Sequence, residues 1–140
     1  MLETDILYAF VKEKDWLKAV AEKLIERIER GDFGDVYVCR EVLHELYYVS
    51  AEEGVSLDEI IFRVNALTRI KHLNFVEISP EVELLALTLM KQYHITSIFD
   101  AYYAATALSV DPDKQIVSTD HVFDRIPGLK RVDPRELIQL

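Results

Sequence analysis

Acidic side chains recur at four places along the chain and are of the type that binds a hard metal ion. Glu3 and Asp5 stand near the start, and Glu45, Asp100 and Asp120 follow at wide intervals. Carboxylate oxygens are the ligands that Mg²⁺ and Mn²⁺ prefer in proteins. A cation held in this way can lower the pKa of a bound water and neutralise charge on a phosphodiester oxygen. The pattern indicates a candidate metal site, provided that the fold brings the four places together.

Each of these acids also has an ordinary structural explanation. Glu3 fits a frayed terminus, and Glu45 fits the solvated face of a helix. Asp100 lies three residues after Ser97 and so completes a capping box, while Asp120 fits a cap on the segment that follows it. Taken one at a time, these explanations are adequate. Taken together, four acids at the junctions of strands and helices favour a shared site.

Short apolar runs alternate with segments of helical spacing, and these elements must position the acids. The apolar runs predict strands at 5–11, 35–39, 74–78, 115–118 and 129–132. Helical spacing and capping residues predict helices over 16–30, 41–51, 56–67 and 80–93, from Ser97 to the turn at Asp111, and after Asp133. Strands that alternate with helices form a parallel sheet covered on both faces, so the sequence predicts an α/β fold. Functional groups gather beyond the carboxyl ends of such strands.

Length and composition narrow the class of protein. The chain has 140 residues, of which 50% are hydrophobic and 29% charged, so we expect one globular domain over residues 1–140. With 16 basic and 25 acidic residues, the net charge of -9 argues against a nonspecific cationic grip on nucleic acid.

The single cysteine and the first residues bear on location. Cys39 cannot form an intramolecular disulfide, which suits a cytoplasmic protein. Glu3 and Asp5 interrupt the first apolar stretch, which argues against a signal peptide. No run approaches the ~18 apolar residues of a membrane span, so we expect no membrane association.

Several segments, in order, resemble the motifs of the PIN-domain ribonucleases. They are Glu3-Thr-Asp-Ile-Leu, Glu45-Leu, Asp100-Ala-x-x-Ala-Ala-x-Ala and Ser118-Thr-Asp-x-x-Phe-Asp, with a closing Ile126-Pro-Gly-Leu-Lys-Arg-Val-Asp-Pro. The resemblance spans nearly the whole chain. The nearest branch of the family is the small VapC-type toxins of prokaryotic toxin–antitoxin pairs.

The resemblance implies a three-layer α/β/α sandwich with a central parallel sheet. It implies cleavage of single-stranded RNA that depends on Mg²⁺ or Mn²⁺. It also implies a homodimer, with an antitoxin protein as a candidate partner. Four tyrosines are candidates for core packing or for the dimer interface, namely Tyr47, Tyr48, Tyr102 and Tyr103. Basic side chains that could steer RNA phosphates are Arg40, Arg125, Lys130 and Arg131.

Individual site residues follow from the same resemblance. Glu45, Asp100 and Asp120 match the second, third and fourth acids of the family. The first motif differs, because most members open with Asp where this chain has Glu3, and either Glu3 or Asp5 serves as the first ligand. The expected metal ligands are therefore Glu3, Asp5, Glu45, Asp100 and Asp120, and the expected catalytic acids are Asp5, Glu45, Asp100 and Asp120.

Three further residues and two other functions complete the expectations. The hydroxyl of Ser118 or Thr119 could orient a carboxylate or phosphate, and Asp124 is an accessory ligand candidate. The leading alternative function is a PIN-fold module that binds RNA or a protein without cleavage, which the unusual Glu3 favours. A nucleotide-binding doubly wound protein is disfavoured, because the chain lacks a glycine-rich phosphate loop.

Overall fold

The computed structural model of the chain describes residues 1–138. The helices are α1 (Thr4–Val11), α2 (Lys18–Glu29), α3 (Val42–Glu52), α4 (Leu57–Thr68), α5 (Pro80–Tyr93), α6 (Ile98–Val110) and α7 (Pro134–Leu137), with a 3-10 helix η1 at His121–Arg125. The strands are β1 (Val36–Cys39), β2 (Leu73–Val76), β3 (Gln115–Val117) and β4 (Lys130–Val132).

The strands form a parallel arrangement that the first residues of the chain join together. β1 pairs with β2 and β3 pairs with β4, both in parallel. Leu2 lies between the two pairs and makes parallel bridges to Val38 and Val117. The Leu2 N–H donates to the Tyr37 carbonyl at 3.0 Å, and the Glu3 N–H donates to the Val117 carbonyl at 3.1 Å. The carboxyl ends of β1 and β3 therefore lie at the same edge, on either side of Glu3.

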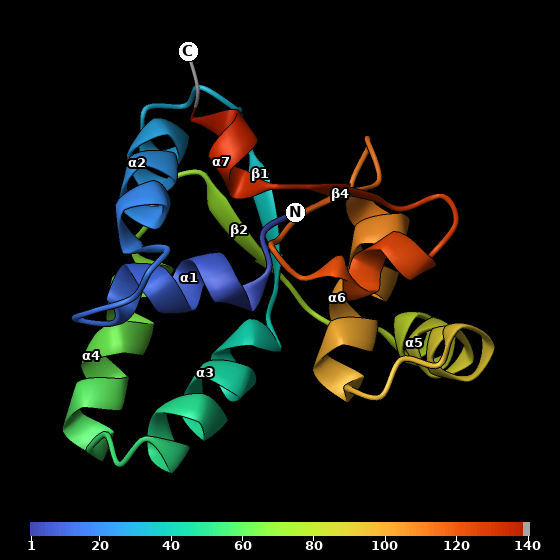
Figure 1. Ribbon diagram of the computed structural model, residues 1–140, viewed down its shortest axis with the longest axis horizontal. Coiled ribbons are helices and arrows are strands. Elements are labelled where there is room, and N and C mark those ends of the chain that lie inside the picture. Colours follow the sequence, from blue (N-terminus) through green and yellow to red (C-terminus); the bar gives the residue numbers. More distant parts are fainter. Residues whose placement is uncertain (139–140) are drawn as a thin grey trace.

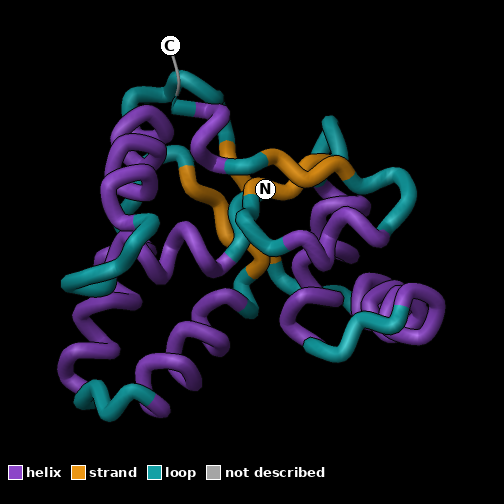
Figure 2. The backbone as a smooth tube through the Cα atoms, in the orientation of Figure 1, coloured by secondary structure: helices purple, strands orange, loops and turns teal. Residues whose placement is uncertain are grey.

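Helices cover both faces of these strands, which confirms the predicted α/β sandwich. Figure 1 shows α2 to the left of β1 and β2, α1, α3 and α4 below them towards the left, and α5 and α6 to the right. The backbone tube in Figure 2 shows the strands gathered at the centre with helices outside them. Within residues 1–138, no helix is long and apolar enough to cross a membrane.

Helix α6 lies deepest against the strands, because its side chains are small. Ala101, Ala104, Ala105 and Ala107 are all fully buried. Small side chains let the helix backbone approach β1 and β3 closely, as the alanine-rich sequence predicts. The start of α6 is therefore held firmly at the edge where the strands end.

The predicted strand at 5–11 is wrong, because this segment forms α1. Glu3 caps the helix by accepting a hydrogen bond from the Asp5 N–H, and Asp5 lies in the first turn. A continuous apolar run has neither a period of two nor a period of 3.6, so a buried strand and a buried helix look alike in sequence. Glu3 and Asp5 accordingly do not share a strand face.

The other predicted elements are present, with ends that shift by a few residues. Ser56, Ser79 and Ser97 each accept a hydrogen bond at the start of a helix, as the sequence predicts. The turn of η1 after β3 is an element that the sequence analysis did not predict. It matters for function because its first residues follow Asp120.

Candidate active site

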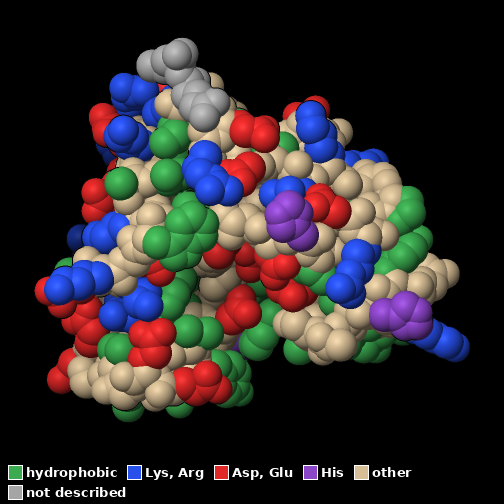
Figure 3. Space-filling view, viewed as in Figure 1, with side chains coloured by type: hydrophobic (Ala, Val, Ile, Leu, Met, Phe, Trp, Pro, Cys, Tyr) green, Lys and Arg blue, Asp and Glu red, His purple; other side chains and the backbone are tan. Residues whose placement is uncertain are grey.

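Five acidic side chains line one open pocket of about 480 Å³. They are Glu3, Asp5, Glu45, Asp100 and Asp120, and Thr4, Tyr8, Val49, Ser97 and Thr119 complete the lining. Figure 3 shows acidic side chains gathered in a hollow near the centre of the visible face. The lining of this pocket contains no lysine or arginine. The structure thus brings together all five carboxylates that the sequence places in the metal site.

Helix starts bring these acids to the pocket. Glu3 and Asp5 lie at the start of α1, Glu45 in the first turn of α3, and Asp100 in the first turn of α6. Asp120 lies three residues after the end of β3 and caps η1, where its Oδ1 accepts from the Val122 N–H at 2.9 Å. The partial positive charge of a helix N-terminus stabilises a nearby carboxylate. The ordinary capping explanations and the shared-site explanation therefore apply to the same residues.

The segment after β3 holds the two acids of the first motif. Ser118 is fully buried, and its hydroxyl donates to Glu3 Oε2 at 3.0 Å while accepting from the Asp120 N–H at 3.0 Å. Thr119 binds Asp5 Oδ2 through both its N–H, at 2.8 Å, and its hydroxyl, at 2.6 Å. Ser118 therefore orients Glu3, and Thr119 orients Asp5.

The remaining acids keep carboxylate oxygens available to the pocket. Glu45 Oε1 accepts from the Tyr103 hydroxyl at 2.9 Å. Ser97 caps α6 by accepting from the Asp100 N–H at 3.3 Å. Among residues 1–138 no hydrogen bond ends on the Asp100 carboxylate. Asp5 differs from the others, because its Oδ1 accepts from the Ile6 N–H at 2.8 Å, so both of its oxygens are used.

Burial and mutual repulsion disfavour the charged form of two of these acids. The pKa of Glu3 is raised well above its ordinary value, chiefly by burial and then by the nearby Asp5. The pKa of Asp100 is raised to about 7, first by burial and then by the charges of Asp120, Glu45 and Asp5. Such shifts cluster at functional sites, where like charges are held together for a purpose.

The acidic side chains that line the pocket fit a hard divalent cation. Their donor groups are carboxylates, and Glu3 Oε1, Glu45 Oε2 and both Asp100 oxygens accept no hydrogen bond within residues 1–138. In the same part of the chain, no three His, Cys, Asp or Glu side chains are already arranged to hold one ion. Mg²⁺ retains several waters and needs only one or two direct carboxylates, so this arrangement is compatible with it.

Asp124, the accessory ligand candidate, is not among the residues that line the pocket. Its Oδ1 accepts from Arg131 Nε at 3.0 Å, and its Oδ2 lies 2.8 Å from His121 Nδ1. Arg131 also donates to the Ser118 carbonyl at 3.1 Å, and its side chain is only 14% exposed. Asp124 and Arg131 therefore support the segment that carries Ser118 and Asp120.

One residue that contacts an acid of the pocket was not predicted to do so from sequence. Tyr103, a candidate for packing or for a dimer interface, is fully buried in the core, and its hydroxyl also binds Glu45. Tyr102 is partly buried and donates to Glu83 Oε1 at 3.0 Å. The spacing of Tyr103, three residues after Asp100 on a helix, is the one signal that could have linked it to the site.

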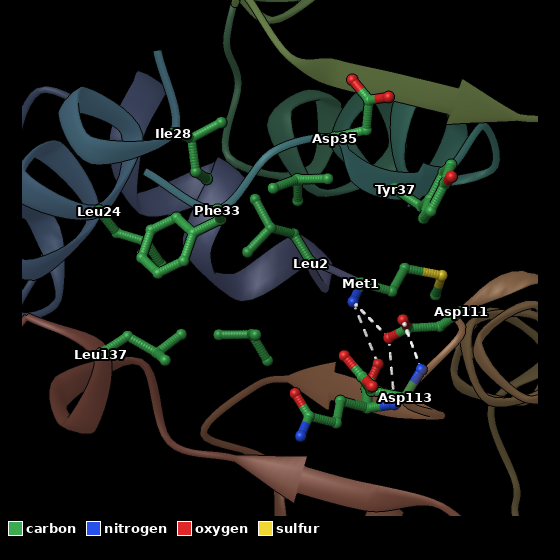
Figure 4. Close-up of a pocket in the computed structure, with 13 residues that line it drawn as sticks. Met1, Leu2, Leu24, Ile28, Phe33, Asp35, Tyr37, Asp111, Asp113 and Leu137 are labelled. Carbon is green, nitrogen blue, oxygen red and sulfur yellow. Dashed lines mark hydrogen bonds and ion pairs between the residues drawn. The ribbon is translucent and has the colours of Figure 1, made fainter. Parts of the chain in front are cut away.

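A second pocket lies at the other end of the strands and has different chemistry. Figure 4 shows Leu24, Ile28, Phe33 and Leu137 on one side of it, with Asp111 and the Met1 amino group on the other. The Met1 ammonium is 3.1 Å from Asp111 Oδ2, so this acid is already paired. The second pocket therefore differs from the first, because it contains a cationic group and is apolar on one side.

Comparison with known proteins agrees with the geometry. The sequence model of the PIN domain matches residues 1–129. No curated protein matches the chain. PIN domains are generally nucleases that depend on divalent metals. The match covers most of the chain and includes all five acids of the pocket, and this chain therefore belongs to the PIN domain family.

Proposed function

We propose that this protein is a metal-dependent endoribonuclease that cleaves single-stranded RNA. The observation that supports this function best is the pocket itself, where five carboxylates meet without a basic residue. Such a cluster is costly unless a cation or protons neutralise it. A nucleolytic site needs a cation at this position, because the phosphodiester that it must bind is also negative.

Glu3, Glu45, Asp100 and Asp120 would hold one or two Mg²⁺ or Mn²⁺ ions. Bound there, such an ion activates water and neutralises charge on the phosphodiester. Between the two candidates for the first ligand, Glu3 is favoured, since Asp5 has both oxygens engaged by Thr119 and by Ile6. Asp5 instead holds the loop after β3 through Thr119. The Ser118 hydroxyl binds both the Glu3 carboxylate and the Asp120 N–H and so fixes the position of these two residues relative to each other.

The basic side chains that could steer RNA differ in how free they are. Arg40 and Lys130 are exposed, and Arg125 is exposed while donating to the His94 carbonyl. Arg131 is held by Asp124 and Ser118, so it is the weakest candidate for a phosphate contact. We propose that Arg40, Arg125 and Lys130 attract the RNA backbone.

The proposed activity is tested with labelled single-stranded RNA and with thermal unfolding, each with and without Mn²⁺. The parent protein should cleave the RNA and gain thermal stability as Mn²⁺ is added. Asp100→Asn should lose both effects. Asp113→Asn is the matched control, because Asp113 is exposed and lines only the second pocket. Equal responses of the parent and Asp100→Asn would contradict the proposal.

A module that binds RNA or protein without cleavage is the second candidate. Glu3 favours it, because the longer side chain replaces the Asp that opens the family motif, and no three acids yet converge on one ion. RNA binding that persists without cleavage in Mg²⁺ or Mn²⁺ would support this candidate.

We also propose a toxin role with a homodimer and an antitoxin partner. An exposed apolar surface on α3 and α4 supports association through Tyr47, Tyr48, Leu57, Ile61 and Phe62. Light scattering of the parent and of Ile61→Asp tests the dimer, which the variant should dissociate. The buried thiol of Cys39 fits the proposed cytoplasmic location.

A further inference from the structure

Tyr103 is a buried residue that contacts an acid of the pocket. Its side chain is fully buried on α6, and its hydroxyl donates to Glu45 Oε1 at 2.9 Å. A buried tyrosine hydroxyl needs a partner, and within residues 1–138 the acceptor of this one is the Glu45 carboxylate. Hydrogen bonds to a charged acceptor are among the stronger ones in proteins.

The contact ties two acids of the pocket to one rigid element. Asp100 and Tyr103 are three positions apart on α6 and so lie on the same side of that helix. The helix therefore carries Asp100 into the pocket directly and holds Glu45, which comes from α3, through the tyrosine hydroxyl. Because α6 is packed tightly against β1 and β3, the spacing of these two carboxylates is determined by the core.

Fewer donors hold Glu45 than hold Glu3 or Asp5. Glu3 is held by the Ser118 hydroxyl, and Asp5 is held by Thr119. The Glu45 side chain is partly exposed, and the Tyr103 hydroxyl is its one donor among the described residues. The hydrogen bond occupies Oε1 and leaves Oε2 available to bind a cation.

We propose that Tyr103 is a positioning residue, whose hydroxyl holds Glu45 in the orientation that binds the divalent cation. This inference rests on the proposed metal-dependent function. Groups that orient metal ligands typically contribute about 10- to 100-fold to metal affinity or activity. Removal of the hydroxyl should therefore weaken Mn²⁺ binding by about 10- to 100-fold, without removing any ligand atom.

The test is Mn²⁺ titration by calorimetry, together with RNA cleavage, for Tyr103→Phe and a matched control. Phenylalanine keeps the buried ring and removes only the hydroxyl. Tyr102→Phe is the control, because Tyr102 lies on the same helix as Tyr103 but its hydroxyl donates to Glu83 of α5, outside the pocket. The control should keep the parent's Mn²⁺ affinity to within about twofold, whereas Tyr103→Phe should not.

Glu45→Asp is a second variant that leaves the buried ring untouched. It shortens the side chain and so withdraws the carboxylate from the Tyr103 hydroxyl and from the cation, which should also weaken Mn²⁺ binding. If Tyr103→Phe does not fold, Glu45→Asp still tests whether the position of the Glu45 carboxylate matters. Adding Tyr103→Phe to Glu45→Asp should cause no further loss if the hydroxyl acts through Glu45.

The outcomes separate this inference from the function on which it rests. A parent that binds Mn²⁺, with Tyr103→Phe weakened and with no further loss when Tyr103→Phe is added to Glu45→Asp, supports the positioning role. If the parent binds Mn²⁺ and either Tyr103→Phe or Glu45→Asp binds it equally tightly, the positioning role is overturned while the proposed function stands. A parent that binds no Mn²⁺ overturns both.

Discussion

Asp100→Asn should make the metal-free protein more stable at neutral pH, although it removes a residue of the proposed site. Asp100 lies among Asp120, Glu45 and Asp5, and burial together with their charges raises its pKa to about 7. Above that pH the folded protein must hold a charge that the unfolded chain carries freely in water. Asparagine has nearly the same shape and no charge, so it removes this cost.

The size of the effect follows from the two pKa values of the carboxyl. The interval between the ordinary 3.8 and the folded value of about 7 corresponds to about 4 kcal/mol in full. Asp100 is only partly buried, and solvent screening reduces the effective charge cost, so we expect about 2 kcal/mol in favour of the variant. For a chain of this length that difference raises the melting temperature by about 6 to 8 °C.

The sign of the pH dependence gives a second check. The folded carboxyl binds its proton more tightly than the unfolded one, so this group stabilises the fold less as pH rises from about 4 through 7. The advantage of Asp100→Asn should therefore be largest near pH 8 and shrink towards pH 5.

Both effects are measured by thermal unfolding in a metal chelator, with Asp113→Asn as the control. The control should stay within about 0.5 kcal/mol of the parent. A variant that is less stable than the parent at neutral pH, or an advantage that does not change with pH, would refute the repulsion argument.

Three other outcomes follow from contacts around the site. Ser118→Ala should lower the free energy of unfolding by about 1 to 3 kcal/mol in a urea titration, because Glu3 Oε2 and the Asp120 N–H both lose a buried partner. Arg131→Ala should lower it by about 1 kcal/mol in the same assay, since the Ser118 carbonyl loses its arginine donor, and an unchanged unfolding midpoint would show that this contact is unimportant. Cys39 is fully buried and its thiol pKa is raised by that burial, so a thiol reagent should modify the unfolded protein much faster than the folded one.

Local signals explain why most elements could be predicted. Ser79 followed by Pro80, and Ser97 followed by Asp100, are helix-start patterns in which the side-chain partner is three residues away, so one sequence window contains both groups. The alanines of α6 likewise predict close packing by their size alone. These predictions were confirmed because they depend only on residues that are close together in the sequence.

The start of the chain could not be predicted in the same way. Leu2 occupies the middle of the strands as a single bridging residue, and the chain then turns at once into α1. The choice between strand and helix for the next apolar residues depends on the edges of β1 and β3, which are formed by segments far along the sequence. For the same reason the Tyr103–Glu45 contact, between residues 58 apart, left no local signature.

The position of the five acids explains how the fold offsets part of the cost of their negative charge and why it does not offset all of it. Three helices, α1, α3 and α6, begin at the pocket, and each N-terminus stabilises a nearby carboxylate by about 0.3 to 1 kcal/mol. Two carboxylates about 5 Å apart repel by about 3 kcal/mol at an effective dielectric constant near 20. Burial and repulsion together therefore exceed what the helix ends supply, which is why the pKa values of Glu3 and Asp100 are raised. The remaining charge must be neutralised by protons or by a cation, and at neutral pH a divalent cation has the advantage because one ion can balance two carboxylates.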